Sequence, residues 1–199
     1  MSDEPDNEML EPLKVTCTMA DCADNLHCFK FHSRKMEEGE RGTCRYCGAS
    51  LVDWERIHSR DSADIEHTVE SLKHEFIRHH FWHAAIDQKA DEHARRKGRL
   101  ALRVAARTRV LNSVGSASPS RDGQQTPFSG NVLYYAQHAT ACCCRSCIEY
   151  WHAIPRGQAL DQAQIDYFAD LIMTYVEQRM PKLPNEPEKI PRRRKPSAR

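Results

Sequence analysis

Apolar residues recur at helical spacing along two stretches of the chain. In residues 61–83 the steps between them are four, three and four residues, which places them on one face of a helix with an acidic first turn. This stripe consists of Ile65, Val69, Leu72 and Phe76. The pattern predicts an amphipathic helix over 61–83.

The second stripe lies near the end of the chain. Asp161 and Gln164 have the spacing of a helix-capping pair, and Pro181 ends the pattern. Strand-like segments are sparse and confined to 49–54 and 132–135. We therefore expect a mainly α fold with one small hairpin, in which a small α+β module precedes a helical domain. The apolar positions of the second stripe are Ile165, Phe168, Ile172 and Val176.

Polar and proline-rich stretches divide the chain into segments. Residues 113–130 are small, polar and turn-forming, which predicts a loop, and residues 181–199 combine five prolines with a basic cluster, which predicts a disordered tail. The expected order is an acidic disordered terminus (1–12), a zinc-knuckle module (13–58), a long helical segment with a basic end (61–112), the loop (113–130), a Cys/His helical domain (131–180) and the basic tail (181–199).

Composition narrows the class of protein. A chain of 199 residues suits one compact domain with appendages and excludes a large multidomain enzyme. No apolar run is long enough to cross a bilayer, and the acidic start MSDEPDNEMLEP differs from a signal peptide. Nine cysteines, an odd number with CxxC spacings, indicate metal thiolates in a reducing compartment rather than a disulfide scaffold. We expect a cytoplasmic, metal-binding protein.

The strongest local motif is the segment GTCRYCGAS. It has the form of a zinc knuckle, with Cys44 and Cys47 on a tight turn that a glycine follows. Tetrahedral zinc needs two more ligands, for which Cys22 and Cys28 are the first choice. Four ligands would close the site, and a closed zinc site is structural because catalysis needs an open position. Spacing leaves three other candidates for these places, which are Cys17, His27 and His32.

The segment HEFIRHH only superficially matches the zinc-protease motif HExxH. Its histidines His74 and His79 are five residues apart, whereas the motif requires four. His79, His83 and Asp87 do share one helical face at steps of four and form a secondary candidate metal site. The alternative is that they are half-buried packing residues beside Phe81 and Trp82.

The densest chemistry lies in the segment QHATACCCRSCIEYWHAIPRG. A helical CCCRSCIEYWH run would let Cys143, Cys144 and Cys147 bind one ion, with His138 and His152 on either side. Thiolates and imidazoles favour zinc or an iron centre, including an iron–sulfur cluster, over magnesium or calcium. The alternative is a buried cysteine-rich helix without metal.

Over about 98–180 the chain resembles a bacterial family known as domain-of-unknown-function family 4186. The resemblance runs through DGQQTP, AQHATA, CCRSC, YWHAIPRG and IDYFADLIMTYVEQRM. The chain departs from the family pattern at 130–132, where Gly-Asn-Val replaces a Gly-His-Pro-like element, and at Cys142, where Thr is usual. The resemblance implies no activity. The family's characteristic positions correspond to Asp122, Gly123, Gln125, Thr126, Pro127, Gln137, His138, Cys143, Cys144, Cys147, Trp151 and His152.

One functional hypothesis is a metal-binding protein that presents a basic surface to nucleic acid. Residues 93–110 hold seven Lys and Arg and no Asp or Glu, so a helix there could pack one face and contact phosphates from 95–109, with the basic tail adding affinity. The alternative is a solvated helix face. The residues expected to reach phosphates are Arg95, Arg96, Arg99, Arg103 and Arg107.

A second hypothesis is a metal-dependent hydrolytic enzyme with an open Cys/His site at 138–152. Zinc lowers the pKa of a bound water to about 7, which supplies hydroxide near neutrality. The chain lacks the deaminase and protease signatures, however. A third hypothesis is thiol redox or iron–sulfur chemistry at the adjacent cysteines. In the enzyme hypothesis the metal ligands would be His138, Cys143 and Cys147, the general acid/base His152, and the substrate-orienting residues Asp122 and Gln125.

Overall fold

Seven α-helices and three short 3-10 turns make up the regular structure of residues 15–120 and 126–190, the part of the chain that the computed structural model describes. Within these residues, strand pairing is limited to two isolated bridges, which confirms the mainly α fold. The predicted acidic terminus, 1–12, lies outside the described residues. The helices are α1 (Trp54–His58), α2 (Ile65–Lys73), α3 (Phe76–His83), α4 (Gln88–Val114), α5 (Val132–Ala139), α6 (Arg145–His152) and α7 (Gln162–Arg179). The turns are η1 (Cys22–Asp24), η2 (Glu38–Glu40) and η3 (Ser62–Asp64).

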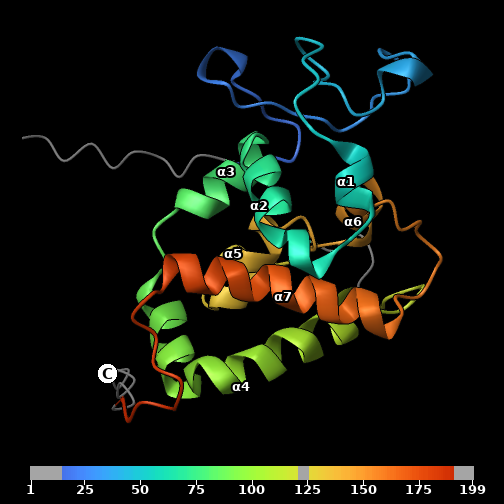
Figure 1. Cartoon of the computed structure of the whole chain (residues 1–199). Helices are drawn as coiled ribbons and strands as arrows, with labels where there is room; N and C mark the ends of the chain where they lie inside the picture. Colours follow the sequence, from blue (N-terminus) through green and yellow to red (C-terminus); the bar gives the residue numbers. More distant parts are fainter. Residues whose placement is uncertain (1–14, 121–125, 191–199) are drawn as a thin grey trace, which may run out of the picture.

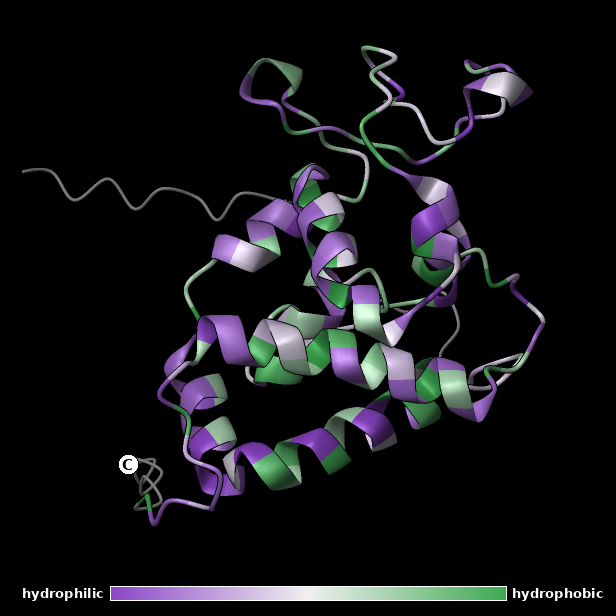
Figure 2. Ribbon diagram, in the orientation of Figure 1, coloured by the Kyte–Doolittle hydropathy of each residue, from purple (hydrophilic) through white to green (hydrophobic). Residues whose placement is uncertain are grey.

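The core of the helical part lies around α5. This helix contacts α3, α4 and α7, and α7 also packs along α4 (Figure 1). Figure 2 shows apolar residues, in green, recurring along α7 and α4. The four stripe residues of α7 are all 0% exposed, and Asp161 and Gln164 form a capping box, so the predicted second helix is confirmed. None of the described helices combines the length and apolar character needed to cross a bilayer.

The predicted helix over 61–83 is interrupted at its centre. α2 ends and α3 begins on either side of Glu75, which has an extended backbone and a fully buried side chain. The backbone there bonds to a distant segment: the His27 N–H donates to the His74 carbonyl at 2.7 Å, and the Phe76 N–H donates to the His27 carbonyl at 2.9 Å. The prediction of one continuous helix over 61–83 was therefore wrong. The contacts that interrupt the helix come from a distant part of the chain, which local periodicity does not include.

The two strand-like segments are not strands. Residues 49–53 are irregular and lead into α1, and residues 132–135 form the first turn of α5. A cap explains the second case, because the Asn131 side chain accepts a hydrogen bond from the Leu133 N–H at 3.0 Å and so starts a helix. The predicted hairpin was therefore wrong.

α4 bends and receives the carboxy-terminal segment at the bend. Gly98 has the non-helical dihedral angles φ 72° and ψ 163°, and α4 changes direction in Figure 1. Beyond the bend, the Arg99 N–H donates to the Pro184 carbonyl at 2.8 Å and the Leu100 N–H donates to the Asn185 carbonyl at 3.2 Å. Residues 181–190, expected to belong to a disordered tail, thus lie against α4, and the remainder of that tail, 191–199, lies outside the described residues.

Residues 15–53 contain no α-helix and lie over one end of the helical part, at the top of Figure 1. An aromatic cluster connects them to that part. The Phe29 ring packs edge-on against Trp54 of α1 and Trp151 of α6, with ring centroids 6.0 Å apart in both pairs. Phe29 and Trp151 are buried, so this cluster forms a second small core between the amino-terminal residues and the helices.

Candidate metal centres

Metal-ligating side chains gather at two places in the described part of the chain. In each group the ligand atoms, one per residue, all lie within 4.8 Å of one another. Both groups could therefore hold a metal ion. The first centre consists of Cys22, His27, Cys44 and Cys47, and the second centre consists of Cys143, Cys144 and Cys147.

The predicted knuckle forms one half of the first centre. Cys44 and Cys47 lie on a tight turn in which the Gly48 N–H donates to the Cys44 carbonyl at 2.8 Å. Gly48 has φ 73°, in the left-handed region that favours glycine. The Cys44 N–H donates in turn to the Ala49 carbonyl at 2.8 Å, which closes the turn. This local geometry brings the two thiols together.

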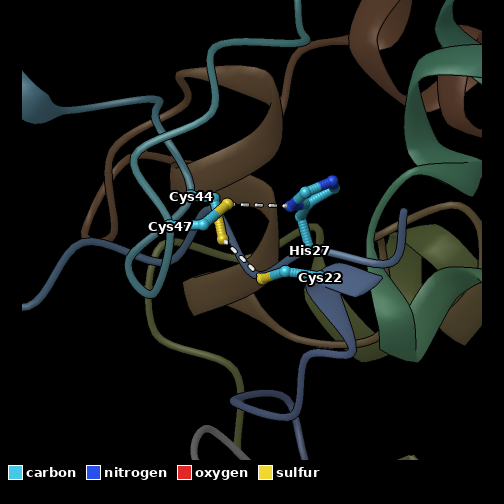
Figure 3. Close-up of side chains that lie close together, drawn as sticks. All are labelled: Cys22, His27, Cys44 and Cys47. Atoms are coloured by element: carbon cyan, nitrogen blue, oxygen red, sulfur yellow. Dashed lines mark hydrogen bonds between the residues drawn. The ribbon is translucent and has the colours of Figure 1, made fainter. Parts of the chain in front are cut away.

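A short loop supplies the other half of the first centre. Asp21 and Leu26 pair through two backbone hydrogen bonds of 2.7 and 2.9 Å, and Asn25 between them adopts φ 57°, which asparagine tolerates. Cys22 and His27 lie just inside and just beyond this pairing. Figure 3 shows both side chains directed toward the two knuckle cysteines.

The distances within the first centre fit a tetrahedral zinc ion. The sulfurs of Cys22 and Cys44 are 3.7 Å apart, and the Cys47 sulfur is 3.4 Å from Nδ1 of His27 (Figure 3). With zinc–sulfur bonds of about 2.3 Å and zinc–nitrogen bonds of about 2.0 Å, tetrahedral angles place two sulfurs about 3.8 Å apart and a sulfur about 3.5 Å from a nitrogen. Two of the distances thus match those between ligands of one zinc ion, and the other ligand atoms lie within 4.8 Å of one another.

The contact of His27 with Asn25 suits ligation through Nδ1. Its Nε2 lies 3.0 Å from Oδ1 of Asn25. Because an amide oxygen only accepts hydrogen bonds, this contact needs a proton on Nε2, and in the neutral ring Nδ1 then keeps its lone pair. A hydrogen bond of this kind is the usual support of a metal-bound histidine.

The thiols of the first centre differ in acidity. Burial alone would raise the pKa of Cys44, but hydrogen bonds from neighbouring groups outweigh it and lower the pKa to about 6. Burial and the thiols of Cys47 and Cys44 raise the pKa of Cys22 to about 12. The surroundings of Cys44 therefore favour its thiolate form, and a bound cation would favour that form in Cys22 as well. The backbone donors to Cys44 are the N–H groups of Cys28, Tyr46 and Cys47.

Cys28, predicted from its spacing as a ligand of this site, lies outside the group. Its buried thiol donates to the Cys17 carbonyl at 3.5 Å. His32, another candidate, accepts a hydrogen bond at Nδ1 from the Arg34 N–H at 3.3 Å. Of the residues that spacing left open, the structure brings His27 to the other three ligands.

The second centre lies at the start of α6. Cys143 precedes the helix, Cys144 is its N-cap with an extended backbone, and Cys147 is in the first turn. The CCCRSC run is therefore helical only from Arg145, rather than from its first cysteine. Cys144 is extended and directly precedes the helix, and its thiol lies with those of Cys143 and Cys147 within 4.8 Å of one another.

A fully buried arginine contacts the second centre. Nη2 of Arg78 lies 3.2 Å from the Cys147 sulfur, and Nη1 lies 3.8 Å from the Cys143 sulfur. Nη1 also donates to the His138 carbonyl at 2.7 Å. Donors from the guanidinium group stabilise sulfur in its thiolate form.

Glu75 is the counter-ion of Arg78. The guanidinium Nε donates to its carboxylate at 2.9 Å, and both side chains are 1% exposed. The Tyr150 hydroxyl and the Trp151 indole N–H donate to the same carboxylate at 2.6 Å each. Burial raises the pKa of Glu75, and the three donors favour its charged form. Sequence reasoning missed this pair, because two charged residues three apart on a helix are ordinarily solvent-exposed neighbours.

Cys147 is the most acidic thiol of the second centre. Hydrogen bonds from the thiols of Cys143 and Cys144 hold its pKa well below the usual range, and the positive charge of Arg78 acts in the same direction against the effect of burial. Since the thiolate is the form that binds metal, the centre already favours one ligand in its binding state.

The two histidines predicted beside these thiols hydrogen-bond elsewhere. Nε2 of His138 donates to the Thr126 carbonyl at 2.9 Å, and Nε2 of His152 donates to the Thr140 carbonyl at 3.1 Å. Burial lowers the pKa of His138 to about 4 and that of His152 to about 3. Both imidazoles are therefore neutral at pH 7, and neither belongs to the group of the second centre.

Of the predicted loop, 113–130, residues 121–125 lie outside the described part of the chain. Asp122 and Gln125, expected to orient a substrate, lie outside the described residues. The buried Thr126 hydroxyl donates to the Cys143 carbonyl at 2.8 Å. The end of the loop thus contacts the backbone of the second centre.

The secondary candidate site at the end of α3 does not form a ligand group among the described residues. The rings of His79 and His83 lie 4.0 Å apart, and Nδ1 of His83 is 2.8 Å from the His79 carbonyl. Asp87 is the N-cap of α4, where its carboxylate accepts from the Ala90 N–H at 3.0 Å and the Tyr135 hydroxyl at 2.9 Å. These contacts give Asp87 a structural role.

The arginines expected to contact nucleic acid form ion pairs within this chain. Two of them pair with acidic residues one turn earlier in α4, and three pair with acidic residues of α7. Nucleic-acid binding stays a prediction that these contacts do not favour. The pairs are Arg95–Asp91, Arg96–Glu92, Arg99–Glu177, Arg103–Asp170 and Arg107–Asp166.

Comparison with known proteins adds a family. A family model described as a domain of unknown function (DUF4186) matches residues 66–177, which confirms the resemblance found in the sequence. The matched region includes the second centre, Glu75 and Arg78, whereas the first centre lies before it. No solved structure matches the chain.

Proposed function

Since this chain belongs to the DUF4186 family of domains of unknown function, which offers no activity to transfer, we propose a function from its side chains: it is a protein that binds two zinc ions, one at each centre, at sites that stabilise its fold. The observation that carries the proposal is the first centre. Three thiols and one imidazole, from two separate loops, lie within 4.8 Å of one another, and two of their distances match those of ligands on one zinc ion.

A structural role for the first centre follows from its four ligands. Four protein ligands fill the tetrahedral coordination of zinc and leave no position for water or substrate. At the second centre, the two histidines that the hydrolytic hypothesis requires already have other contacts. His152 is fully buried and neutral, and both His138 and His152 are hydrogen-bonded to backbone carbonyls. A neutral imidazole with a pKa of about 3 is a poor proton donor near neutrality, which argues against the enzyme hypothesis.

The spacing of the second centre favours one zinc ion over an iron–sulfur cluster. Its three sulfurs lie within 4.8 Å of one another, close to the separation of about 3.8 Å expected for thiolates on one zinc ion. A four-iron cluster attaches each thiolate to a different iron and so spreads the sulfurs more widely.

The proposal is tested by the metal content of the full chain, purified anaerobically without added metal. We expect two zinc equivalents per chain and no visible absorption. Cys44→Ser should lower the zinc content by one equivalent and destabilise residues 15–53, because metal binding in a small module supplies folding free energy.

Cys28→Ser is the matched control, since Cys28 is a neighbouring buried cysteine outside both groups. It should retain both equivalents. If Cys44→Ser kept the full zinc content, the first centre would be wrong. If the purified chain instead contained iron and sulfide and had a broad visible absorption, the second centre would be assigned to an iron–sulfur cluster and not to zinc.

A further inference from the structure

An open pocket of about 580 Å³ lies between the amino-terminal residues and two helices. One wall comes from residues 29–31 and 41–42, and the other comes mainly from α1 and α6, which pack against each other (Figure 1). Sites for small molecules have volumes of about 300–1,000 Å³, so the pocket has a suitable size. None of its described lining residues belongs to either ligand group, and the pocket is therefore separate from both metal centres.

The described apolar side chains that line the pocket are all aromatic. The Trp54 indole N–H donates to the Gly42 carbonyl at 2.9 Å, and the Tyr150 hydroxyl donates to the Glu75 carboxylate at 2.6 Å. Because the polar atoms of both side chains are engaged within the protein, their rings offer carbon surface to a ligand. Planar rings pack favourably on such surfaces. The aromatic lining residues are Phe29, Phe31, Trp54 and Tyr150.

Contacts between the rings hold the two walls in place. The ring centroid of Trp54 lies 5.0 Å from that of Trp151 and 6.2 Å from that of Tyr150 within the helical part. It lies 6.0 Å from that of Phe29 in the opposite wall. A Cβ atom at Gly42 would overlap the Trp54 indole, so this side chain lies directly against the backbone of the opposite wall. A ligand would meet rings that are already ordered, which lowers the cost of binding.

Three cationic side chains line the pocket together with one carboxylate. The Arg156 guanidinium group pairs with this carboxylate, that of Glu149, at 3.1 Å. Arg41 pairs with Glu38. Lys30 is exposed, and no described hydrogen bond or ion pair engages its ammonium group. An anionic group on a ligand would therefore pair with Lys30 without breaking a contact within the protein.

We propose that this pocket binds a small planar aromatic anion, whose ring packs against Phe31 and Trp54 and whose phosphate or carboxylate pairs with Lys30. A neutral ring would leave the lysine unpaired, and an anion without a ring would leave the aromatic surface uncovered. The site needs two parts of the chain, because residues 29–58 precede the DUF4186 match at 66–177 and α6 lies within it. The proposal does not depend on the zinc ions.

The test is isothermal titration calorimetry of the full chain as purified, with two pairs of probes. Adenosine 5′-monophosphate is compared with adenosine, and indole-3-acetate is compared with indole-3-acetamide, so each ring is offered with and without its anionic group. Inorganic phosphate is the anion without a ring. We expect at least one ring anion to bind about fivefold more tightly than its neutral partner, which is the contribution of an exposed charge pair, and more tightly than phosphate. Which pair shows the difference distinguishes a phosphate ligand from a carboxylate ligand.

Two variants test the two halves of the recognition. Lys30→Ala should remove the difference between the anion and its neutral partner. Lys35→Ala, at an exposed lysine of the same segment outside the pocket lining, is the matched control and should keep it. Phe31→Leu keeps an apolar side chain without a ring, and it should weaken binding of the anion and of the neutral partner alike, by about tenfold. Circular dichroism and the metal content of each variant show that the fold is retained.

The outcomes that overturn the proposal are distinct. It fails if neither ring anion binds, if inorganic phosphate binds as tightly as the ring anions, or if Lys30→Ala and Lys35→Ala bind the anion equally well. Should Phe31→Leu not fold, Lys30→Ala, at an exposed side chain, still decides. None of these results bears on the zinc proposal, because the metal content is measured separately.

Discussion

The stability of the fold depends on the protonation state of two buried histidines. His138 and His152 each donate a proton at Nε2 to a backbone carbonyl, and in both rings Nδ1 is buried without a described hydrogen-bond partner. Protonation of Nδ1 would place a positive charge in an apolar interior, near the positive charge of Arg78. The fold therefore requires both imidazoles to be neutral.

This requirement predicts a loss of stability in mild acid. An exposed histidine in the unfolded chain has a pKa of about 6.5, whereas burial lowers that of His152 to about 3 in the folded protein. The unfolded state therefore takes up the proton first, so the contribution of neutral His152 is complete above about pH 6.5 and decreases as the pH falls toward 3. At pH 5 the loss is roughly 2 kcal/mol for one such histidine.

Urea unfolding at pH 7.5 and pH 5 measures this effect. His152→Gln keeps an N–H donor and cannot titrate, so its free energy of unfolding should depend less on pH than that of the wild type. Metal release in acid affects both proteins alike and cancels in the difference. The exposed His83, changed to Gln, is the control for the replacement of a histidine as such. Equal pH dependence in His152→Gln and wild type would contradict a neutral buried His152.

The buried pair of Glu75 and Arg78 gives a second residue-scale prediction. Arg78→Met leaves the Glu75 carboxylate without its counter-ion and should cost about 3–5 kcal/mol of unfolding free energy. The double variant Glu75→Gln with Arg78→Met should recover part of the loss. Arg56→Met, at the exposed pair with Asp64, should cost less than about 1 kcal/mol. A loss at Arg78 no larger than that at Arg56 would contradict a buried, charged pair.

At the scale of elements, sequence patterns predicted the features whose geometry depends on residues close together in the chain. The capping pair Asp161 and Gln164 and the apolar stripe gave α7 with its buried face. The CxxC spacing placed Cys44 and Cys47 on one knuckle, and the CCRSC motif placed three thiols at the second centre. In each case the residues that decide the geometry are within a few positions of one another.

Features that depend on distant contacts were not predictable. The break between α2 and α3 arises where His27 pairs with the backbone at Glu75. That His27 rather than Cys28 joins the first group follows from which side of the chain faces the knuckle, and spacing alone does not give that direction. The role of Gly98 likewise appears only once residues 184–186 lie beside it.

Gly98 gives the element-scale prediction. A Cβ atom there would lie 2.5 Å from the Asn185 carbonyl oxygen and from the Glu186 carbonyl carbon, and φ is 72°. Gly98→Ala should therefore cost on the order of 2–3 kcal/mol, through backbone strain and displacement of the segment 181–190. The measurement is thermal unfolding, together with proteolysis after residue 180.

Two other glycines separate the effect of backbone strain from that of the close contact with residues 185 and 186. Gly157 also has positive φ, at 85°, but a Cβ would meet nothing within 4 Å, so Gly157→Ala measures backbone strain alone. Gly39 has open space and no positive φ, and Gly39→Ala should be nearly neutral. If Gly98→Ala were no more destabilising than Gly157→Ala, the close approach of residues 185 and 186 would not matter.

At the scale of the whole molecule, the proposed zinc ion of the first centre would hold together residues 15–53, which contain no α-helix. The main apolar core, around α5 and α7, contains none of the residues of the two ligand groups. Chelation of zinc should therefore expose residues 15–53 to proteases while most of the helical circular dichroism signal remains. Loss of the whole helical signal on chelation would contradict this division.

The most direct measurement is native mass spectrometry of the full chain, purified anaerobically without added metal. Nine free cysteines and two ligand groups lead us to expect the mass of the chain plus two zinc ions, reverting to the chain mass with all thiols reduced after acid denaturation. A native mass equal to that of the metal-free chain, or one lowered only by disulfide formation, would contradict the proposal that these cysteines hold metal.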